Sequence, residues 1–328
     1  MNFQPLATSP LHKLYVINCP LKKIDVSPLK NTLTELWLGT LQNTYFWEEI
    51  NHKQTKPKYQ LLDLSKMKKL KRVYACGVAS LKTVKLKDTK TKQGIRSLLE
   101  LHLYGTGIRT LDATAAKNLK RLFVGDRIRK LTVDKCKKLK EIGVINLGSK
   151  QAATIKSSSV QHIQYQGKTL KKLSFSKCPK LYTLSIKCTK VGTVNLRSNK
   201  RLHYMTLNSK KTGKVVYPKV STKGWHDCCD LVETNYYKNL DEFKNDPDAK
   251  GVYKEYVGYI LEYPTKILDI SAWTSLNKTV KRCMFGYGDF DHKKCATKKI
   301  IINKKLRKAD KKWIKKFAKK WHVKVVEK

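Results

Sequence analysis

An internal repeat of about 21 residues restricts what this chain can fold into more than any other feature of the sequence. Successive anchor residues are separated by steps of 21, 20, 21, 21 and 21 residues. These anchors are Leu98, Leu119, Leu139, Val160, Leu181 and Leu202. A unit of this size cannot bury its apolar side chains alone, so the copies must stack into a solenoid. Such a stack offers open strand surfaces to a partner, and binding is the first expectation.

Each anchor opens the same short pattern, apolar-x-x-apolar-x-apolar, as in Leu119, Leu122 and Val124. Nine first halves of this kind can be placed up to Leu207, which is about two-thirds of the chain. The pattern resembles the leucine-rich repeat family, whose first half runs L-x-x-L-x-L-x-x-N/C-x-L. Cys19 stands at the Asn/Cys position of the first copy. The resemblance implies a strand from each unit on the concave face of an arc.

The second half of each unit also has strand character. Apolar and polar residues alternate there with period two, whereas the longer eukaryotic repeats are commonly helical in this half. The segments are 24–27, 84–87, 131–134, 173–176 and 194–197. The resemblance is closest to the short, irregular repeats of bacterial surface and secreted proteins. The expected fold is a β-dominated α/β class, a leucine-rich repeat solenoid with parallel β-ladders and a C-terminal helix-strand cap.

The chain divides into four expected segments. The repeats occupy residues 1–217, an irregular Tyr-rich and acid-containing insertion 218–263, degenerate repeats 264–303, and a helix and strand 304–328. In the helix one apolar face collects Leu306, Trp313, Ile314, Phe317, Ala318 and Trp321. Such a basic helix could lie on an anionic membrane. We favour a structural cap, because the last coil of a solenoid must be covered.

The charge of the chain is strongly positive. Lys and Arg total 70 against 25 acids, a formal net charge of +45, which attracts polyanions. Only ten of the 70 are Arg. Because base-edge readers rely on the Arg fork, the Lys excess argues against sequence-specific nucleic-acid recognition. Most lysines fall in turns, where they are also expected simply to form a solvated rim.

Localisation follows from the resemblance more than from a signal in the chain. The sequence has no apolar run of the roughly 18 residues that a membrane-spanning helix needs. The first ten residues lack the basic and apolar regions of a signal peptide. The family resemblance implies an extracellular or cell-surface protein, with a cytoplasmic one as the alternative.

Nine cysteines leave at least one without a partner in the chain. Cys136 and Cys178 lie two coils apart and are expected to be buried free thiols. Any disulfide is expected among Cys228, Cys229, Cys283 and Cys295. His226 and His292 near these cysteines hint at zinc, but the spacing is not that of a known finger. The acids between 241 and 248 lack the ordered calcium loop, so we expect no metal and no cofactor.

Catalytic motifs are absent from the sequence. There is no G-x-S-x-G elbow, no P-loop and no H-E-x-x-H. An open repeat stack also lacks the desolvated cleft that acid-base chemistry uses. We therefore expect a protein that is not an enzyme.

The candidate binding site comes from the outward position between the second and third apolar residues of each unit. Down the stack this position reads Tyr15, Trp37, Tyr74, His102, Phe123, Gly143, Gln164, Ser185 and Thr206. Strands about 4.8 Å apart would place the first five rings in a ladder about 19 Å long, with Tyr104 beside it. We expect the five rings of the ladder to be at least partly exposed and, together with Tyr104, to bind a protein or glycan.

Three alternatives stay open. In the first, the rings only stabilise the sheet by stacking across the strands. In the second, the insertion at 40–60 covers the rings. The third alternative places function elsewhere, on the Lys-rich turns, which would bind an anionic cell-wall polymer or nucleic acid without sequence specificity.

Overall fold

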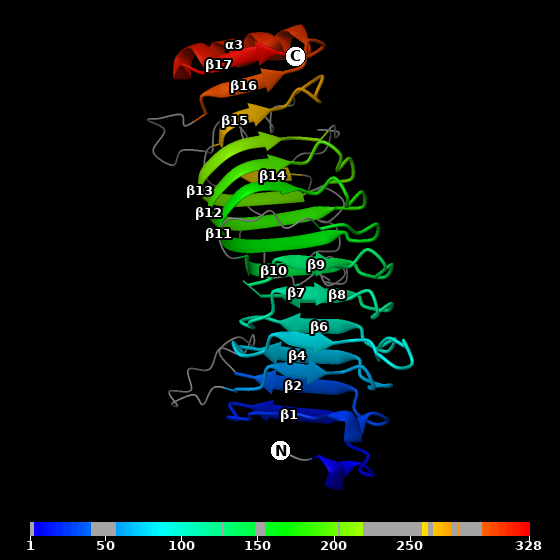
Figure 1. Cartoon of the computed structure of the whole chain (residues 1–328). Helices are drawn as coiled ribbons and strands as arrows, with labels where there is room; N and C mark the ends of the chain where they lie inside the picture. The colour runs from blue at the N-terminus through cyan, green and yellow to red at the C-terminus, as the bar shows by residue number, and fades with distance from the viewer. Residues whose placement is uncertain are drawn as a thin grey trace, which may run out of the picture. The chain divides into compact units, whose positions relative to one another are not determined.

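The chain folds as a parallel β-solenoid in which successive repeats add strands to a main sheet (Figure 1). The computed structural model describes residues 3–40, 57–125, 127–147, 155–202, 204–218, 258–261, 265–276, 281 and 297–328. Two compact units are present. The first unit comprises Met1–Gly148 and Ala153–Val160, and the second comprises Ser149–Ala152 and Gln161–Lys328.

The main sheet of the first unit takes one parallel strand from each repeat. In order across the sheet these are β1 (Lys13–Ile17), β2 (Glu35–Gly39), β4 (Arg72–Cys76), β6 (Glu100–Leu103), β8 (Arg121–Val124) and β10 (Glu141–Leu147). The apolar pattern points into the core, where Leu36, Leu101 and Leu122 are completely buried. Because every strand starts at the same repeat position, equivalent residues lie opposite one another.

The second halves of the first unit form short ladders, as predicted. β3 (Leu61–Asp63) pairs in parallel with β5 (Thr83–Lys85), and β7 (Thr110–Asp112) pairs with β9 (Lys130–Thr132). Two 3-10 turns, η1 (Gln4–Leu6) and η2 (Ser27–Leu29), complete the described elements of this unit. The strand predicted at 24–27 is wrong: only Asp25 forms a β-bridge there, and the 3-10 turn η2 begins at Ser27, with Pro28 as its second residue.

The second unit contains three strands of 13 residues each, β11 (His162–Ser174), β12 (Thr183–Asn195) and β13 (Tyr204–Val216). Here the two halves of a repeat are one continuous strand and not two short ones, which corrects the prediction. In the first unit Gly77 and Gly105 turn the chain after the first half, with φ of 73° and 63°. Gly167, Cys188 and Ser209 occupy that position in β11, β12 and β13, where they lie within the strands and pair with one another. A glycine at this position therefore permits the turn but does not by itself produce it.

The remaining strands of the second unit continue its sheet. β14 (Gly258–Leu261) and β15 (Thr265–Asp269) pair with β13, and β16 (Lys299–Ile302) pairs with β15 and with β17 (Lys324–Glu327). The degenerate repeats expected around residues 268 and 300 are thus strands of the solenoid. Helix α3 (Lys308–Trp321) lies beside β17 at the C-terminal end and forms the expected cap (Figure 1).

The buried face of α3 differs from the predicted one. Asp310, Ile314 and Ala318 are buried, whereas Trp313, Phe317 and Trp321 are half-buried and lie side by side along the helix, with centroids 5.8 and 6.5 Å apart. Asp310 accepts from Arg307 Nε at 2.9 Å and from the backbone N–H of Leu276 at 2.9 Å, and Lys281 Nζ lies 2.8 Å away. Burial alone would raise the pKa of Asp310, but these donors hold it below its usual value.

Neighbouring coils are also joined by polar side chains that bind backbone carbonyls of the preceding coil. Asn118 donates to Arg96 at 2.7 Å, and Asn199 donates to Cys178 at 2.9 Å. The expected free thiols are confirmed: Cys136 and Cys178 are buried and unbridged. Burial raises the pKa of Cys136 to about 11.

Candidate functional site

Five rings cross the outer face of the main sheet in the first unit and form a continuous stack, the aromatic row. Its members are Tyr15, Trp37, Tyr74, His102 and Phe123, each opposite the next in the strand register. The ring centroids are 5.6, 3.9, 4.5 and 4.6 Å apart in that order. The predicted adjacency of these side chains is therefore confirmed.

The aromatic row is exposed at the Tyr15 end and buried at the Phe123 end. Tyr15 is 56% exposed, Trp37, Tyr74 and His102 are intermediate, and Phe123 is only 7% exposed. Tyr104, at 6%, packs against His102 and Phe123. The expectation that Phe123 is at least partly exposed is wrong, and Tyr104, expected to contact the partner, is buried as well.

The burial of Phe123 has a local cause in the next strand. Gly143 lies opposite Phe123, and a Cβ at this glycine would overlap the phenyl ring. Without a side chain at Gly143 the ring lies against β10. Phe123 and Tyr104 then form a small buried cluster with Cys76.

Stacking determines which part of each ring faces solvent. Trp37 has a stacked ring on each side, and Tyr74 lies between Trp37 and His102. The faces of these rings are therefore covered, and their outward parts are edges. Tyr15, at the end of the row, has a neighbouring ring on one side only among the described residues.

A second row, the charged row, runs beside the aromatic row and was missed in the sequence. It consists of Lys13, Glu35, Arg72, Glu100, Arg121 and Glu141, one from each strand of the sheet. The signs alternate without exception. These residues occupy the third position of the repeat pattern, so aligning the copies at that position would have revealed the row.

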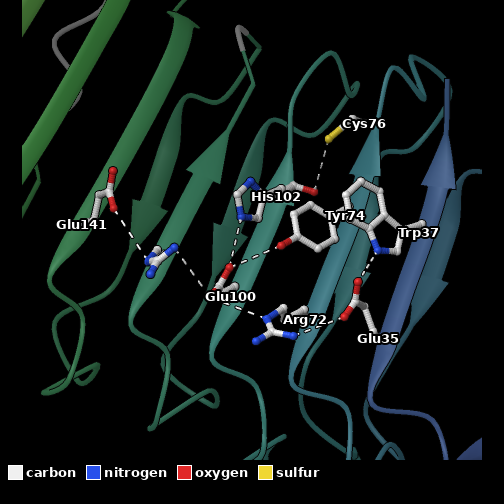
Figure 2. Close-up of polar contacts among 9 residues, drawn as sticks. Glu35, Trp37, Arg72, Tyr74, Cys76, Glu100, His102 and Glu141 are labelled. Carbon is white, nitrogen blue, oxygen red and sulfur yellow. Dashed lines mark hydrogen bonds and ion pairs between the residues drawn. The ribbon is translucent and has the colours of Figure 1, made fainter. Parts of the chain in front are cut away.

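Contacts within the charged row neutralise most of it (Figure 2). Glu35 Oε1 accepts from Trp37 Nε1 at 2.6 Å, and its Oε2 lies 3.2 Å from an Arg72 nitrogen. Arg72 and Arg121 each lie 3.8 Å from Glu100, and Arg121 lies 4.0 Å from Glu141. Paired charges of this kind make the sheet face amphipathic but unattractive to a polyanion.

The two rows are coupled at the centre of the sheet (Figure 2). The Tyr74 hydroxyl donates to Glu100 Oε2 at 3.4 Å, and burial together with Glu100 raises the pKa of Tyr74 to about 12. His102 Nε2 lies 3.8 Å from the same carboxylate. Burial lowers the pKa of His102, although Glu100 opposes that shift. His102 lowers the pKa of Glu100 in turn, against the effect of burial.

The lowered pKa values predict acid sensitivity. Both His102 and Glu100 titrate below their usual values, so they stabilise the fold above those values and the stabilisation is lost as the pH falls. We expect His102→Phe, which keeps a ring between Tyr74 and Phe123, to lose less thermal stability than the wild type between pH 7 and 5. Thermal unfolding at each pH measures this. An unchanged pH dependence would show that His102 contributes nothing to it.

The aromatic row has no counterpart in the described part of the second unit. The same repeat position there holds Gln164, Ser185 and Thr206, and Thr206 donates to Ser185 at 3.0 Å. The hydroxyls of Ser185 and Thr206 thus bond to each other across β12 and β13.

A third set of side chains lies on the turns of the first unit, two residues before each anchor. This cationic turn row consists of Lys68, Arg96, Lys117 and Lys137, all exposed. Successive coils of a solenoid are about 4.8 Å apart, so these cations lie on one ridge. Unlike the charged row, the cationic turn row has no acid at the same position of the four repeats.

Several predicted features lie outside the described residues. These are residues 41–56 of the first insertion, Cys228, Cys229, Cys283, Cys295, His226, His292 and the acids between 241 and 248. Within the described residues, no group of three or more His, Cys, Asp or Glu could hold a metal ion. The described helices include none that is long and apolar enough to cross a membrane.

Comparisons with known proteins give little beyond the geometry. No family model matches the chain, and no curated protein matches it. One similar solved structure is described as the functional domain of InlJ from Listeria monocytogenes, which includes a cysteine ladder. It is 12% identical over 85% of this chain and 68% of that chain, with a TM-score of 0.26. The fold assignment therefore rests on the strand pairing itself.

Proposed function

We propose that this chain is a non-enzymatic binding protein of the short, irregular leucine-rich repeat type. Its partner is a protein held on the outer face of the main sheet in the first unit. The observation that carries the proposal is the pair of adjacent rows, one aromatic and one of alternating charge, on a face built by six strands in register. A rigid surface of this kind loses little conformational entropy when a partner docks.

The stacking favours a protein over a glycan. Sugars pack their apolar faces on open ring faces, but the faces of Trp37 and Tyr74 are covered by neighbouring rings. Ring edges and paired charges instead suit the mixed apolar and polar surface of a folded partner. Tyr15, Trp37 and Tyr74 are the proposed contacts, because Phe123 and Tyr104 are buried.

The proposed localisation is extracellular or on the cell surface, and it rests on the resemblance to bacterial surface repeats. A partner would then come from outside the cell. Affinity capture from a host or cell-wall extract, repeated at low and high salt, is the route to identify it.

Once a partner is identified, truncating the centre of the exposed rings tests the site. We expect Trp37→Ala to weaken binding by about 2 kcal/mol, because it removes the indole and leaves Tyr15 and Tyr74 without their shared neighbour. Titration calorimetry measures the loss. The matched control is Gln164→Ala, at the same repeat position in the second unit, which should bind normally. Normal binding by Trp37→Ala would make the aromatic row structural only.

The cationic turn row supports a second candidate function, binding of an anionic polymer. Its four exposed cations face no acid at their own repeat position, in contrast to the neutralised sheet face. Heparin serves as the probe. Affinity that falls steeply with salt, and falls further in a Lys68→Ser, Lys117→Ser and Lys137→Ser triple variant, would favour this candidate. Retained heparin affinity in the triple variant would exclude the ridge as its site.

A further inference from the structure

The first strand of the main sheet has an open edge. β1 pairs with β2 on one side, and no other described strand pairs with it. Glu35 N–H donates to His12 and Asn18 N–H donates to Gly39, which sets the direction of every group in β1. In a parallel ladder alternate residues bond to the same neighbour. The N–H and C=O groups of Lys13, Tyr15 and Ile17 therefore point away from β2, towards the open edge.

The aromatic row and the charged row both end at this edge. The last side chain of each row has no partner on its outer side in the described part of the chain. Tyr15 is the most exposed ring of the aromatic row, and its outer ring face has no stacked neighbour among the described residues. Lys13 ends the charged row, is exposed, and has no acid within 4.0 Å in the described part of the chain. By contrast, β2, β4, β6 and β8 each supply a ring and a charge opposite to that of both neighbouring strands, and β10 supplies Glu141 but has Gly143 at the ring position.

We propose that the open edge of β1 binds an extended, acidic segment of another protein, which adds to the sheet as a further parallel strand. Its backbone would bond to the outward groups of Lys13 and Tyr15 and to the N–H of Ile17, whose C=O accepts from Cys19 Sγ at 3.3 Å. An acid opposite Lys13 and an aromatic residue opposite Tyr15 would continue the charged and aromatic rows. The recognised sequence is thus acid-x-aromatic, read from the N-terminus. This edge goes beyond the face proposed above, because it uses backbone groups that the face does not.

A second copy of this chain fits the edge less well. Two chains of net charge +45 repel each other, whereas an acidic segment is attracted. In an antiparallel pair of β1 strands centred on Tyr15, Lys13 would lie opposite Ile17 of the copy, and its charge would stay unpaired. The observations therefore favour a heterologous, acidic segment.

Labelled peptides test the proposal. The probe is a fluorescein-labelled decapeptide of Thr, Val and Ser with a central Glu-Thr-Tyr, and the control carries Tyr-Thr-Glu. Fluorescence anisotropy should show binding of the first and clearly weaker binding of the second. Equal binding of the two peptides would overturn the proposed register.

The decisive variant removes one edge donor without changing the face. Ile17→Pro deletes an outward N–H, and we expect it to weaken peptide binding about tenfold, while Ile17→Ala changes it less than about threefold. Circular dichroism confirms that both variants fold. Wild-type affinity in folded Ile17→Pro would sink the proposal and leave the face proposal standing.

Reversing the charge of Lys13 tests the edge site without introducing a proline. Lys13→Glu should prefer a Lys-Thr-Tyr peptide over Glu-Thr-Tyr, whereas Lys68→Glu, an equal charge change on the cationic turn row, should keep the wild-type preference. Loss of preference in both variants would mean general charge attraction and would overturn the edge site. Sedimentation of the wild type completes the test: a dimer that Ile17→Pro dissociates would assign the edge to a second copy instead.

Discussion

Replacing Gly39 with alanine is expected to lower the free energy of unfolding of the first unit by about 3 kcal/mol or more. Gly39 ends β2 with φ of 108°, where L side chains are strained. A Cβ there would overlap the carbonyl oxygen of Cys76 and lie 2.8 Å from its carbonyl carbon. These are backbone atoms of the neighbouring strand β4, so the overlap is relieved only if β2 and β4 separate. Urea unfolding followed by tryptophan fluorescence measures the loss.

Gly77→Ala is the matched control for the backbone strain. Gly77 also has a positive φ, 73°, which costs alanine about 1 kcal/mol by itself. The amount by which Gly39→Ala loses more unfolding free energy than Gly77→Ala then measures the effect of the overlap with Cys76. Because Trp37 and Tyr74 cross the same strand pair, their stacking should loosen as well, and near-ultraviolet dichroism would show it. Equal losses of unfolding free energy in Gly39→Ala and Gly77→Ala would mean that the structure accommodates the Cβ at position 39 with no further loss of stability.

The strand register was predictable from the sequence because two regularities combine. A unit of near-constant length returns each position to the same place in the next coil, and side chains in a strand alternate with period two. The position between the second and third apolar residues therefore lines up from Tyr15 through Gly143. The period alone fixes which side chains are neighbours.

The exposure of those side chains was not predictable in the same way. It depends on how each ring tilts and on what the next strand leaves free. Phe123 is buried because Gly143 has no side chain to occupy the space that the ring takes. The unbroken 13-residue strands of the second unit were not predictable either, because Gly167 stays within β11 at the position where Gly77 and Gly105 turn the chain.

The charged row shows a different kind of miss. The net charge of +45 describes the chain as a whole and does not show the order of the charges at one repeat position. Three acids, Glu35, Glu100 and Glu141, lie at one repeat position and alternate with Lys13, Arg72 and Arg121. A repeat protein should therefore be aligned for charge at every position, because alternation across strands stabilises neighbours that uniform charge would repel.

Asp310→Ala is expected to destabilise the C-terminal cap by about 3 kcal/mol. The fully buried Asp310 carboxylate interacts with Lys281, Arg307 and the backbone N–H of Leu276, and removal leaves these donors without their acceptor. The estimate is at the low end for a buried ion pair because the Arg307 side chain is 62% exposed and regains water. Hydrogen exchange of β16 and β17, which form the last coil beneath α3, measures the loss.

The pH dependence identifies the charge of Asp310 as the cause. Its pKa in the folded protein lies below the ordinary value of 3.8, so the carboxylate contributes its full stabilisation above that pH and loses it as the pH falls through the lower folded value. The difference between wild type and Asp310→Ala should therefore be constant from pH 7 to 5 and shrink below pH 4. Asp310→Asn keeps an acceptor and should lie between the two at neutral pH. A difference that persists undiminished in acid would mean that lost packing, and not the ion pairs, destabilises the cap.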